Sequence, residues 1–293
     1  MIYDPKIIAL PGSKISLKDY ITNDTGVFKT KEEAKKKLKE DISKLKKLQD
    51  KLYAHDKYAL LLIFQAMDAA GKDGTIKHVM SGVNPQGCQV FSFKNPSAEE
   101  LDHDYLWRIY KCLPERGRIG IFNRSYYEEV LIVKVHPELL LRQQLPGISS
   151  TQHITNSIWE LRYNQINSFE RHLVENGTII LKFFLHLSRD EQKKRFLERI
   201  SNPDKNWKFS MNDINERNYW DDYQRAFEDT LSKTSTEYAP WYIIPADHKW
   251  YMRTIVGDII VHTLESLPLK YPKVNKSKLE EIQKARKILG DKN

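Results

Sequence analysis

The chain has few cysteines, no long hydrophobic run and no internal repeat. Cys88 and Cys112 are its two cysteines, and their wide spacing fits no metal-binding pattern and suggests reduced thiols. No apolar run approaches the ~18–20 residues of a membrane span. The first residues lack the charged-then-apolar order of a signal peptide. These absences predict a cytoplasmic protein that is neither held by disulfides nor embedded in a membrane.

The composition suits a globular protein with anionic partners. The 293 residues are 40% hydrophobic and 11% aromatic, which is enough for one large core or two modest ones. We interpret residues 1–293 as a single domain. The net charge of +8, from 47 basic and 39 acidic residues, favours phosphates or nucleic acid as partners without choosing between them.

Residues 58–74 carry the clearest local signal. An apolar run ends in a turn of small residues, and Gly71-Lys72 precedes a segment with helical spacing. This order predicts a strand, a phosphate-binding loop and a helix, because loop amides and a helix N-terminus together attract a polyanion. Compared with the G-x-x-x-x-G-K-[ST] pattern, Ala66 replaces the first glycine and Asp73 replaces the hydroxyl residue. The alternative is a plain strand, turn and helix with a solvated Lys72.

Asp68 lies inside this predicted loop. A carboxylate there repels a phosphate unless a divalent cation separates the two. Asp68 is therefore a candidate magnesium ligand or proton acceptor. The alternative is that its side chain caps the N-terminus of the next helix.

Strand and helix patterns alternate along the chain, which implies a parallel sheet. The predicted strands are residues 58–64, 88–93, 118–122, 178–187 and 241–245. The predicted helices include residues 30–56, 98–112, 152–176 and 188–200, a helix carrying Trp220 to Phe227, and an apolar helix that ends at Leu267. Residues 1–28 are predicted to be irregular and to wrap onto the body.

Polar residues follow the predicted strand at 118–122, with the order Asn-Arg-Ser-Tyr-Tyr-Glu at 123–128. Functional groups in such sheets gather at the carboxyl ends of strands. Arg124 can bind a phosphate through two hydrogen bonds, or it can form a structural ion pair. Glu128 is a candidate ligand for a base edge or a metal-bound water, or an ordinary acid in a first helical turn.

Residues 189–234 are predicted to form a lid. A helix at its start places Arg195 and Arg199 four residues apart on one face, and a loop with basic and aromatic residues, including Lys208, precedes another helix. A lid over a phosphate chain needs such cations to neutralise charge and exclude water. The alternative is a solvated helical hairpin.

Both ends of the chain are basic. The N-terminal extension, residues 1–56, contains the 30–56 helix, whose leucine stripe packs against the body while its lysines lie elsewhere. These lysines have no interleaved aromatics, so a solvated face is favoured over nucleic-acid binding. The C-terminal tail, residues 268–293, is helix-prone from about Ser277.

Three motifs together resemble the polyphosphate kinase 2 family. They are Asp-Ala-Ala-Gly-Lys-Asp-Gly at 68–74, Asn-Arg-Ser-Tyr-Tyr-Glu at 123–128, and Trp-Lys-Phe-Ser at 207–210 with Trp-Asp-Asp-Tyr at 220–223. They occur in the family's order, and the resemblance covers about residues 30–267. The family's loop usually reads Gly-x-Asp-Ala-Ala-Gly-Lys, so Ala66 departs from it. The form Gln65-Ala-Met-Asp, with Tyr-Tyr-Glu where other branches have Trp-Tyr-Asn, resembles the branch called class III.

The resemblance implies an α/β, thymidylate-kinase-like fold of the P-loop kinases, with three layers around a five-stranded parallel sheet and a helical lid. It implies reversible phosphoryl transfer between inorganic polyphosphate and nucleotides, dependent on magnesium or on manganese in its place. Class III implies AMP and ADP as acceptors and ATP as a product, with guanine nucleotides as further candidates. Homodimers or homotetramers are implied, and neither nucleic acid nor a membrane is expected as a partner.

The resemblance and the residue chemistry together assign a site. The predicted catalytic residues are Asp68, Lys72, Arg124, Arg195 and Arg199. The predicted phosphate and polyphosphate ligands are Ala69, Ala70, Gly71, Asp73, Gly74, Thr75, Lys77, Lys94 and Lys208. The predicted nucleotide ligands are Asn123, Arg124, Tyr127 and Glu128, and the predicted metal ligands are Asp68 and Glu128. Phosphoryl transfer needs positioning and charge neutralisation more than covalent chemistry, and this set supplies both.

Two other functions fit the sequence. A nucleoside or nucleotide kinase of similar fold would use ATP as donor, although such kinases usually have Gly-Lys-Ser or Gly-Lys-Thr in the loop. A basic nucleic-acid-binding module would use the 30–56 helix, and its binding would fall steeply with salt and be unaffected by Lys72→Ala.

Overall fold

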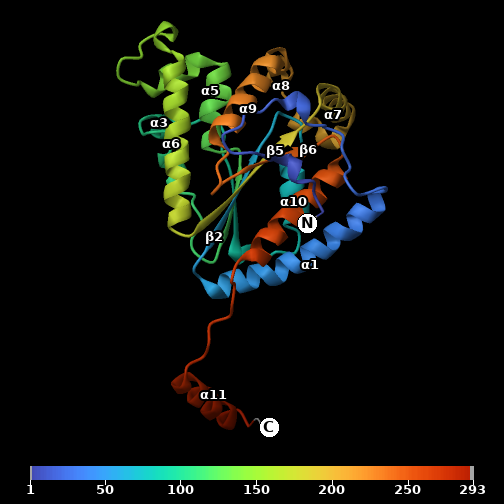
Figure 1. Cartoon of the computed structure of the whole chain (residues 1–293), viewed down its shortest axis with the longest axis vertical. Helices are drawn as coiled ribbons and strands as arrows, with labels where there is room; N and C mark the ends of the chain where they lie inside the picture. The colour runs from blue at the N-terminus through green and yellow to red at the C-terminus, as the bar shows by residue number, and fades with distance from the viewer. Residues whose placement is uncertain (1, 291–293) are drawn as a thin grey trace.

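The structure is a computed structural model that describes residues 2–290, and it is built around a six-stranded sheet (Figure 1). The strand order is β1-β6-β5-β2-β4-β3. The parallel strands are β2 (Ala59–Gln65), β3 (Cys88–Ser92), β4 (Ile119–Asn123), β5 (Thr178–His186) and β6 (Trp241–Pro245). The predicted α/β sheet with five parallel strands is therefore confirmed.

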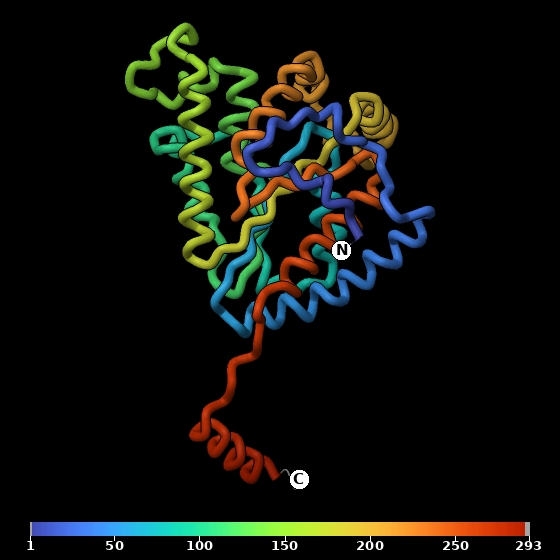
Figure 2. Tube along the Cα trace, viewed as in Figure 1, coloured from blue at the N-terminus to red at the C-terminus, as the bar shows by residue number. Residues whose placement is uncertain are grey.

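One strand is missing from the sequence prediction. β1 (Ile8–Ala9) pairs antiparallel with β6, so residues 1–28 are not wholly irregular. Two residues are too few for an alternating pattern to be recognised, and β1 forms because the edge of β6 offers unpaired backbone groups. The rest of this segment wraps over the body as predicted, and its Leu17 amide donates to Glu228 Oε1 at 2.8 Å (Figure 2).

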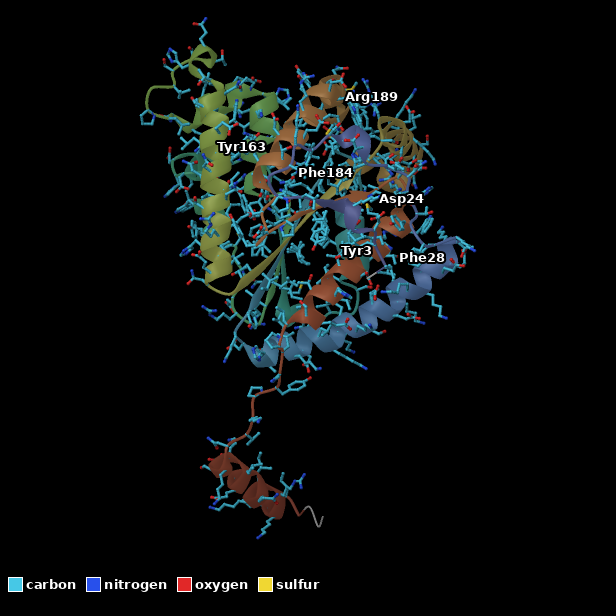
Figure 3. The ribbon with its side chains drawn as sticks, viewed as in Figure 1. Tyr3, Asp24, Phe28, Tyr163, Phe184 and Arg189 are labelled. Carbon is cyan, nitrogen blue, oxygen red and sulfur yellow. The ribbon has the colours of Figure 1, made fainter. Side chains whose placement is uncertain are left out.

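Helices cover both faces of the sheet. α5 (Ile132–Val135), α6 (Asn156–Glu175) and α9 (Trp220–Thr234) lie on one face, and α1 (Lys31–His55), α2 (Lys72–Val79) and α10 (Lys249–Ser266) lie on the other (Figure 1). β2 is buried throughout and contributes alternate residues to the two cores, Leu61 to one and Leu62 to the other. Tyr163 and Phe184 belong to the first core and Tyr3 to the second (Figure 3).

The shorter and peripheral helices are α3 (Ala98–Leu101), α4 (Trp107–Tyr110), α7 (Arg189–Ser201), α8 (Met211–Asn215) and α11 (Lys276–Ile288). The continuous helix predicted at 98–112 is wrong, since two short helices replace it. Asp104 Oδ1 accepts a hydrogen bond from the Leu106 amide at 2.9 Å, and this local bond competes with a continuous helical ladder.

The two basic terminal segments differ in how they pack. α1 begins at a capping box formed by Thr30 and Glu33, and its Leu45 and Leu52 are buried against the body as predicted. α11 extends away from the body at the end of an irregular tail (Figure 2). Residues 291–293 of the predicted tail lie outside the described residues. Among the helices within 2–290, none combines the length and apolar character that crossing a bilayer needs.

The position of β2 determines where the functional groups meet. β4 lies on one side of β2 and β5 on the other. The chain leaves β2 toward β3 and β4 on one side, and the connection from β4 then passes to β5 on the opposite side, which makes β2 the point where the strand order reverses. Phe64 near the end of β2 is in register with Asn123 at the end of β4. The loop that follows β2 and the segment that follows β4 therefore share one edge of the sheet.

Candidate active site

The loop after β2 has the backbone shape of an anion-binding turn. Gly71, with φ 103°, is the N-cap of α2, and Ala69 also has a positive φ of 63°. Left-handed residues in such a turn point successive N–H groups into a concavity, and the first-turn amides of α2 point the same way. Gly71 offers no side-chain cap and Asp68 supplies none, so the interpretation of Asp68 as a helix cap is wrong.

Lys72 lies at the start of α2 and is 9% exposed. Its Nζ donates to the Ala66 carbonyl at 2.9 Å, and this is its one hydrogen bond within residues 2–290. Burial and then the nearby Arg124 guanidinium lower the pKa of the Lys72 ammonium, against the opposing effect of Asp68. The interpretation of Lys72 as a solvated surface lysine is therefore wrong.

Asp68 and Arg124 form an ion pair across the ends of β2 and β4. Arg124 Nη2 lies 2.9 Å from Asp68 Oδ1, and both side chains stay about one-third exposed, at 37% and 30%. Arg124 has a left-handed φ of 64°, and its amide donates to the Phe64 carbonyl at 3.0 Å. Burial opposes the charge of Arg124, but Glu128 and Asp68 outweigh it and raise the pKa of the guanidinium. A strained residue at this position marks a candidate functional site.

These groups lie on a cleft of about 680 Å³ between the strand ends, α7, the loop after α7, and α10. Its basic side chains are Lys72, Lys94, Arg124, Arg195, Arg199, Lys205, Lys208, Lys249 and Arg253. Its acidic side chains are Asp68, Asp73, Glu198 and Asp213. A cleft whose wall is mostly cationic attracts a long anion.

Arg195 has a different position from the one predicted. Its guanidinium donates to the carbonyls of Ala69, Ala70, Ala246 and Asp247 at 2.7 to 3.2 Å, and its Nε lies 2.9 Å from Glu191 Oε1. The side chain is buried and fastens the phosphate loop to the turn before α10. It lines the cleft, but its hydrogen bonds are used to hold the backbone.

The other predicted lid cations have fewer bonds. Arg199 pairs with Asp213 at 3.1 Å and donates to the Lys208 carbonyl at 3.2 Å. Lys208 Nζ is 3.9 Å from Asp73, whose other carboxylate oxygen accepts from Asn123 Nδ2 at 2.6 Å. The structure thus brings Arg199, Lys208, Asp73 and Asn123 together at the cleft.

Several cleft residues are absent from the sequence assignment, and two of them are cations on α10. Lys249 and Arg253 are one turn apart at the start of α10, and both line the cleft. Burial and the nearby Arg195 lower the pKa of each, and the buried Arg253 Nε makes no hydrogen bond within residues 2–290. The signal in the sequence is a Lys and an Arg spaced by four, directly after the carboxyl end of the last strand.

Several predicted residues lie elsewhere. Lys77 is exposed on α2 and does not line the cleft. Thr75 is buried, with its hydroxyl donating to the Gly71 carbonyl at 3.0 Å. Tyr127 is fully buried, and its hydroxyl bonds to Glu170 and Lys182 in the core. Ala69, Gly71 and Gly74 line the cleft, Ala70 is buried beneath it, and Lys94 reaches its rim.

Glu128 borders a second, smaller cavity beside the cleft, which we call the side hollow. It has a volume of about 80 Å³ and shares Lys94 and Arg124 with the cleft. Burial raises the pKa of the Glu128 carboxyl, although Arg124 and Lys72 oppose the rise. The side hollow therefore places a buried carboxyl group beside the cations Arg124 and Lys94.

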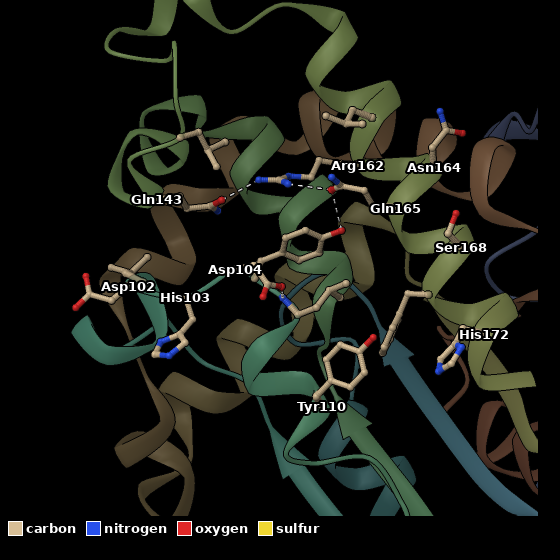
Figure 4. A pocket seen from close by; sticks show the side chains of 16 residues that line it. Asp102, His103, Asp104, Tyr110, Gln143, Arg162, Asn164, Gln165, Ser168 and His172 are labelled. Atoms are coloured by element: carbon tan, nitrogen blue, oxygen red, sulfur yellow. Dashed lines mark hydrogen bonds between the residues drawn. The ribbon is translucent and has the colours of Figure 1, made fainter. Parts of the chain in front are cut away.

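A larger hollow, about 920 Å³, lies away from the phosphate loop, against α6 and the 101–110 segment (Figure 4). Arg162 donates to both Gln143 and Gln165 at 2.9 Å, and the Tyr105 hydroxyl donates to Gln165 at 3.3 Å. These polar groups bond to one another, whereas the cleft holds cations with unused donors. We therefore take the cleft as the candidate active site.

The donor groups in the cleft suit magnesium better than a metal held entirely by protein. Within residues 2–290, no group of three or more His, Cys, Asp or Glu side chains is arranged to hold a metal. Magnesium commonly takes one or two carboxylates and completes its shell with water and substrate phosphates. Asp68 lines the cleft, and one of its carboxylate oxygens is not bonded to Arg124.

The fold and the site define a P-loop kinase-like α/β protein with a polyanion cleft, and comparison with known proteins agrees. The family model described as Polyphosphate kinase 2 matches residues 28–272. The chain is 54% identical over 278 residues to the ADP-polyphosphate phosphotransferase of Rhodopseudomonas palustris, covering 95% of each chain. It is 47% identical to the AMP/ADP-polyphosphate phosphotransferase of Meiothermus ruber, covering 89% of this chain and 93% of that one.

A solved structure is similar over nearly the whole chain. The crystal structure of polyphosphate kinase 2 from Arthrobacter aurescens TC1 matches with a TM-score of 0.85 and 41% identity, covering 94% of each chain. The chain therefore belongs to the polyphosphate kinase 2 family.

Proposed function

We propose that this protein transfers phosphoryl groups from inorganic polyphosphate to nucleoside mono- and diphosphates, converting AMP to ADP and ADP to ATP, reversibly. The observation that carries the proposal is the cleft, in which Lys72, the Asp68–Arg124 pair and a cationic wall meet at one edge of the sheet. A donor with many phosphates needs a long cationic surface beyond the reacting centre, and Arg199, Lys208, Lys249 and Arg253 supply it.

The chemistry needs positioning and charge neutralisation rather than a covalent intermediate. Lys72 and the loop amides hold the reacting phosphates, since the Lys72 ammonium has two unused N–H groups within residues 2–290. Arg124 holds the transferring phosphate or the nucleotide, with Asn123 beside it. Arg199 and Lys208 act from the lid, residues 189–234, and Arg195 acts by holding the loop. Tyr127 acts from the core, by fixing the segment that carries Arg124.

Magnesium, or manganese in its place, neutralises phosphate charge when bound. Asp68 is the proposed ligand, with Glu128 contributing directly or through water. The alternative role for Asp68 is that of proton acceptor rather than metal ligand. Chelation with EDTA should remove turnover, and added magnesium should restore it. Turnover that persists in EDTA would contradict this assignment.

Glu128 is the basis for proposing AMP as well as ADP as an acceptor. Its carboxylate faces the side hollow next to Arg124, where a further metal or water can be positioned for the shorter nucleotide. One relative is named for ADP and another for both AMP and ADP, so the acceptor nucleotide has to be determined for this chain by experiment. Guanine nucleotides are proposed as further acceptors.

The proposal also includes a homodimer or homotetramer in the cytoplasm. The reduced state expected of Cys88 and Cys112, which are both free thiols here, supports this compartment. Light scattering of the purified protein would measure the oligomeric state.

Product analysis tests the function directly. The purified chain is incubated with magnesium and long-chain polyphosphate, with AMP or ADP supplied separately. We expect ATP from ADP, and ADP followed by ATP from AMP. Product from ADP alone would remove the role given to Glu128, and ATP-dependent transfer without any polyphosphate activity would replace the proposal with a nucleotide kinase.

A further inference from the structure

Gln65 is a buried amide whose two polar atoms face different partners. It is the last residue of β2 and is 1% exposed. One polar atom of its amide is 3.1 Å from both the backbone nitrogen and Oγ of Ser125. The other is 2.9 Å from Glu128 Oε1. Gln65 therefore bridges the start of the 125–128 segment to its acidic end.

The partners determine the orientation of this amide. The Ser125 backbone N–H can only donate, so the Gln65 atom facing it is the oxygen. The nitrogen then faces the carboxylate of Glu128 and donates to it. The Ser125 hydroxyl donates to the same Gln65 oxygen and accepts from the Tyr127 amide at 3.2 Å. The reverse orientation would turn an N–H group toward an N–H group and an oxygen toward a carboxylate.

This bridge gives the Glu128 carboxylate one preferred direction. A free glutamate rotates about three side-chain bonds, whereas a charge-assisted bond to a buried and fixed donor removes much of that freedom. Gln65 and Ser125 are both buried, and the bonds from Ser125 to the Gln65 oxygen restrict the rotation of the donating amide. Gln65 lines neither the cleft nor the side hollow, so it acts on a substrate indirectly, and of its two partners Glu128 and Ser125 only Glu128 carries a charge.

We propose that Gln65 is a positioning residue that holds Glu128 toward the side hollow and thereby sets the use of a nucleoside monophosphate as acceptor. The inference rests on the proposed function, in which Glu128 assists the shorter nucleotide. A carboxylate held within a fraction of an ångström assists a reaction far more than one that samples several directions.

The first experiment compares Gln65→Met with the unaltered protein. Methionine is close in size to glutamine but cannot donate to a carboxylate. We expect kcat with AMP to fall about tenfold, the loss of one bond to a charged group, and kcat/KM with ADP to change less than about threefold. Gln49→Met, which replaces a buried glutamine on α1, is the matched control. It should leave the ratio of turnover with AMP to turnover with ADP unchanged.

A double-mutant cycle separates positioning from a general structural role. In a Glu128→Ala background, Gln65→Met should lower AMP turnover by less than about twofold, because the group through which Gln65 acts is gone. An equal loss in both backgrounds, or an equal loss with ADP, would overturn the proposal.

Exchanging the two side chains tests whether the position of the charge matters. In Gln65→Glu combined with Glu128→Gln, the new carboxylate accepts from Ser125 and from the new amide, so the bridge is kept. We expect a melting temperature within a few degrees of the unaltered protein and AMP turnover no higher than in Glu128→Gln alone. Recovery of AMP turnover would overturn the proposal.

The same assays distinguish this inference from the proposed function. If the unaltered protein transfers phosphate to neither nucleotide, the proposed function fails and the inference fails with it. If it uses both nucleotides and Gln65→Met leaves their ratio unchanged, only the inference fails. If it uses ADP alone, polyphosphate transfer stands, while the acceptor role of Glu128 and the inference are both wrong.

Discussion

Lys72 and Lys182 are both buried lysines, but their surroundings differ. Lys182 on β5 is fully buried, and its Nζ donates to Glu170 Oε2 at 2.6 Å, to the Thr234 carbonyl at 2.7 Å and to the Tyr127 hydroxyl at 2.9 Å. All three N–H donors are used. Lys72 has one carbonyl partner within residues 2–290 and lies at an open cleft.

The difference separates a structural charge, Lys182, from Lys72, the charge that we propose to be functional. The Glu170 carboxylate that pairs with Lys182 also accepts from the hydroxyls of Tyr126 and Tyr127, so the pair ties β5 and α6 to the segment after β4. A buried ammonium with unused donors costs stability, and a protein retains that cost where a ligand supplies the missing partners. Four experiments test whether the two lysines differ in this way.

Lys182→Met should have the largest effect on folding. Removing one partner leaves the Glu170 charge buried and unpaired, which should lower the free energy of unfolding by about 3–5 kcal/mol. Urea denaturation measures the change. Lys182→Met combined with Glu170→Leu should regain part of the loss, and a single variant as stable as the unaltered protein would contradict a structural role.

Lys72→Met and Asp68→Asn should each reduce turnover strongly and change the stability of the fold little. Each should remove at least ~3 kcal/mol of transition-state stabilisation, more than a hundredfold in kcat/KM with ADP. The free energy of unfolding should change by less than about 1 kcal/mol, because neither change empties a packed core. Steady-state kinetics measures the loss of kcat/KM, and urea denaturation measures the free energy of unfolding. Near-normal turnover in either variant would contradict the site assignment.

Arg195 and Arg199 extend the comparison to the predicted lid. Arg195→Ala removes bonds to four backbone carbonyls, so it should lower the free energy of unfolding by about 2–3 kcal/mol as well as reduce turnover. Arg199→Ala should cost less than about 1 kcal/mol of stability but reduce kcat by roughly 10–100-fold. Equal stability losses in the two variants would mean that both arginines are structural.

Lys249 and Arg253 should show the smallest effects. Lys249→Ala or Arg253→Ala should raise KM for polyphosphate about three- to tenfold, with kcat within about twofold, because each removes one cation that binds the ground state and the transition state alike. The effect should shrink at high salt. Lys46→Ala, an exposed lysine on α1, is the control, and an equal change there would contradict a local contact.

Local patterns were sufficient to predict the five parallel strands, the phosphate loop and the segment after β4. Each depends on residues close in sequence, such as the apolar run before Gly71 and the polar run from Asn123. Their meeting at one edge followed from the rule for parallel sheets, and the register of Phe64 with Asn123 bears this out.

Other features depended on contacts between distant residues. Arg195 fits a lid cation by its helical position, but its guanidinium bonds to carbonyls of residues 69, 70, 246 and 247. Lys249 and Arg253 follow a strand that carries no recognised motif. The helix predicted at 98–112 is interrupted where the Asp104 side chain accepts a hydrogen bond from the Leu106 amide, and β1 pairs with a strand more than 200 residues away in the sequence.

The amino-acid sequence alone was enough to predict the five parallel strands, the loop with Lys72 and Asp68, and the motifs of the polyphosphate kinase 2 family. The folded structure was needed to find β1, to tell which basic residues bond to the backbone and which line the cleft, and to show that the Gln65 amide contacts Glu128. The physical reason is that secondary structure and turns follow from neighbouring residues, whereas burial and pairing of a charge depend on groups that folding brings together from distant parts of the chain.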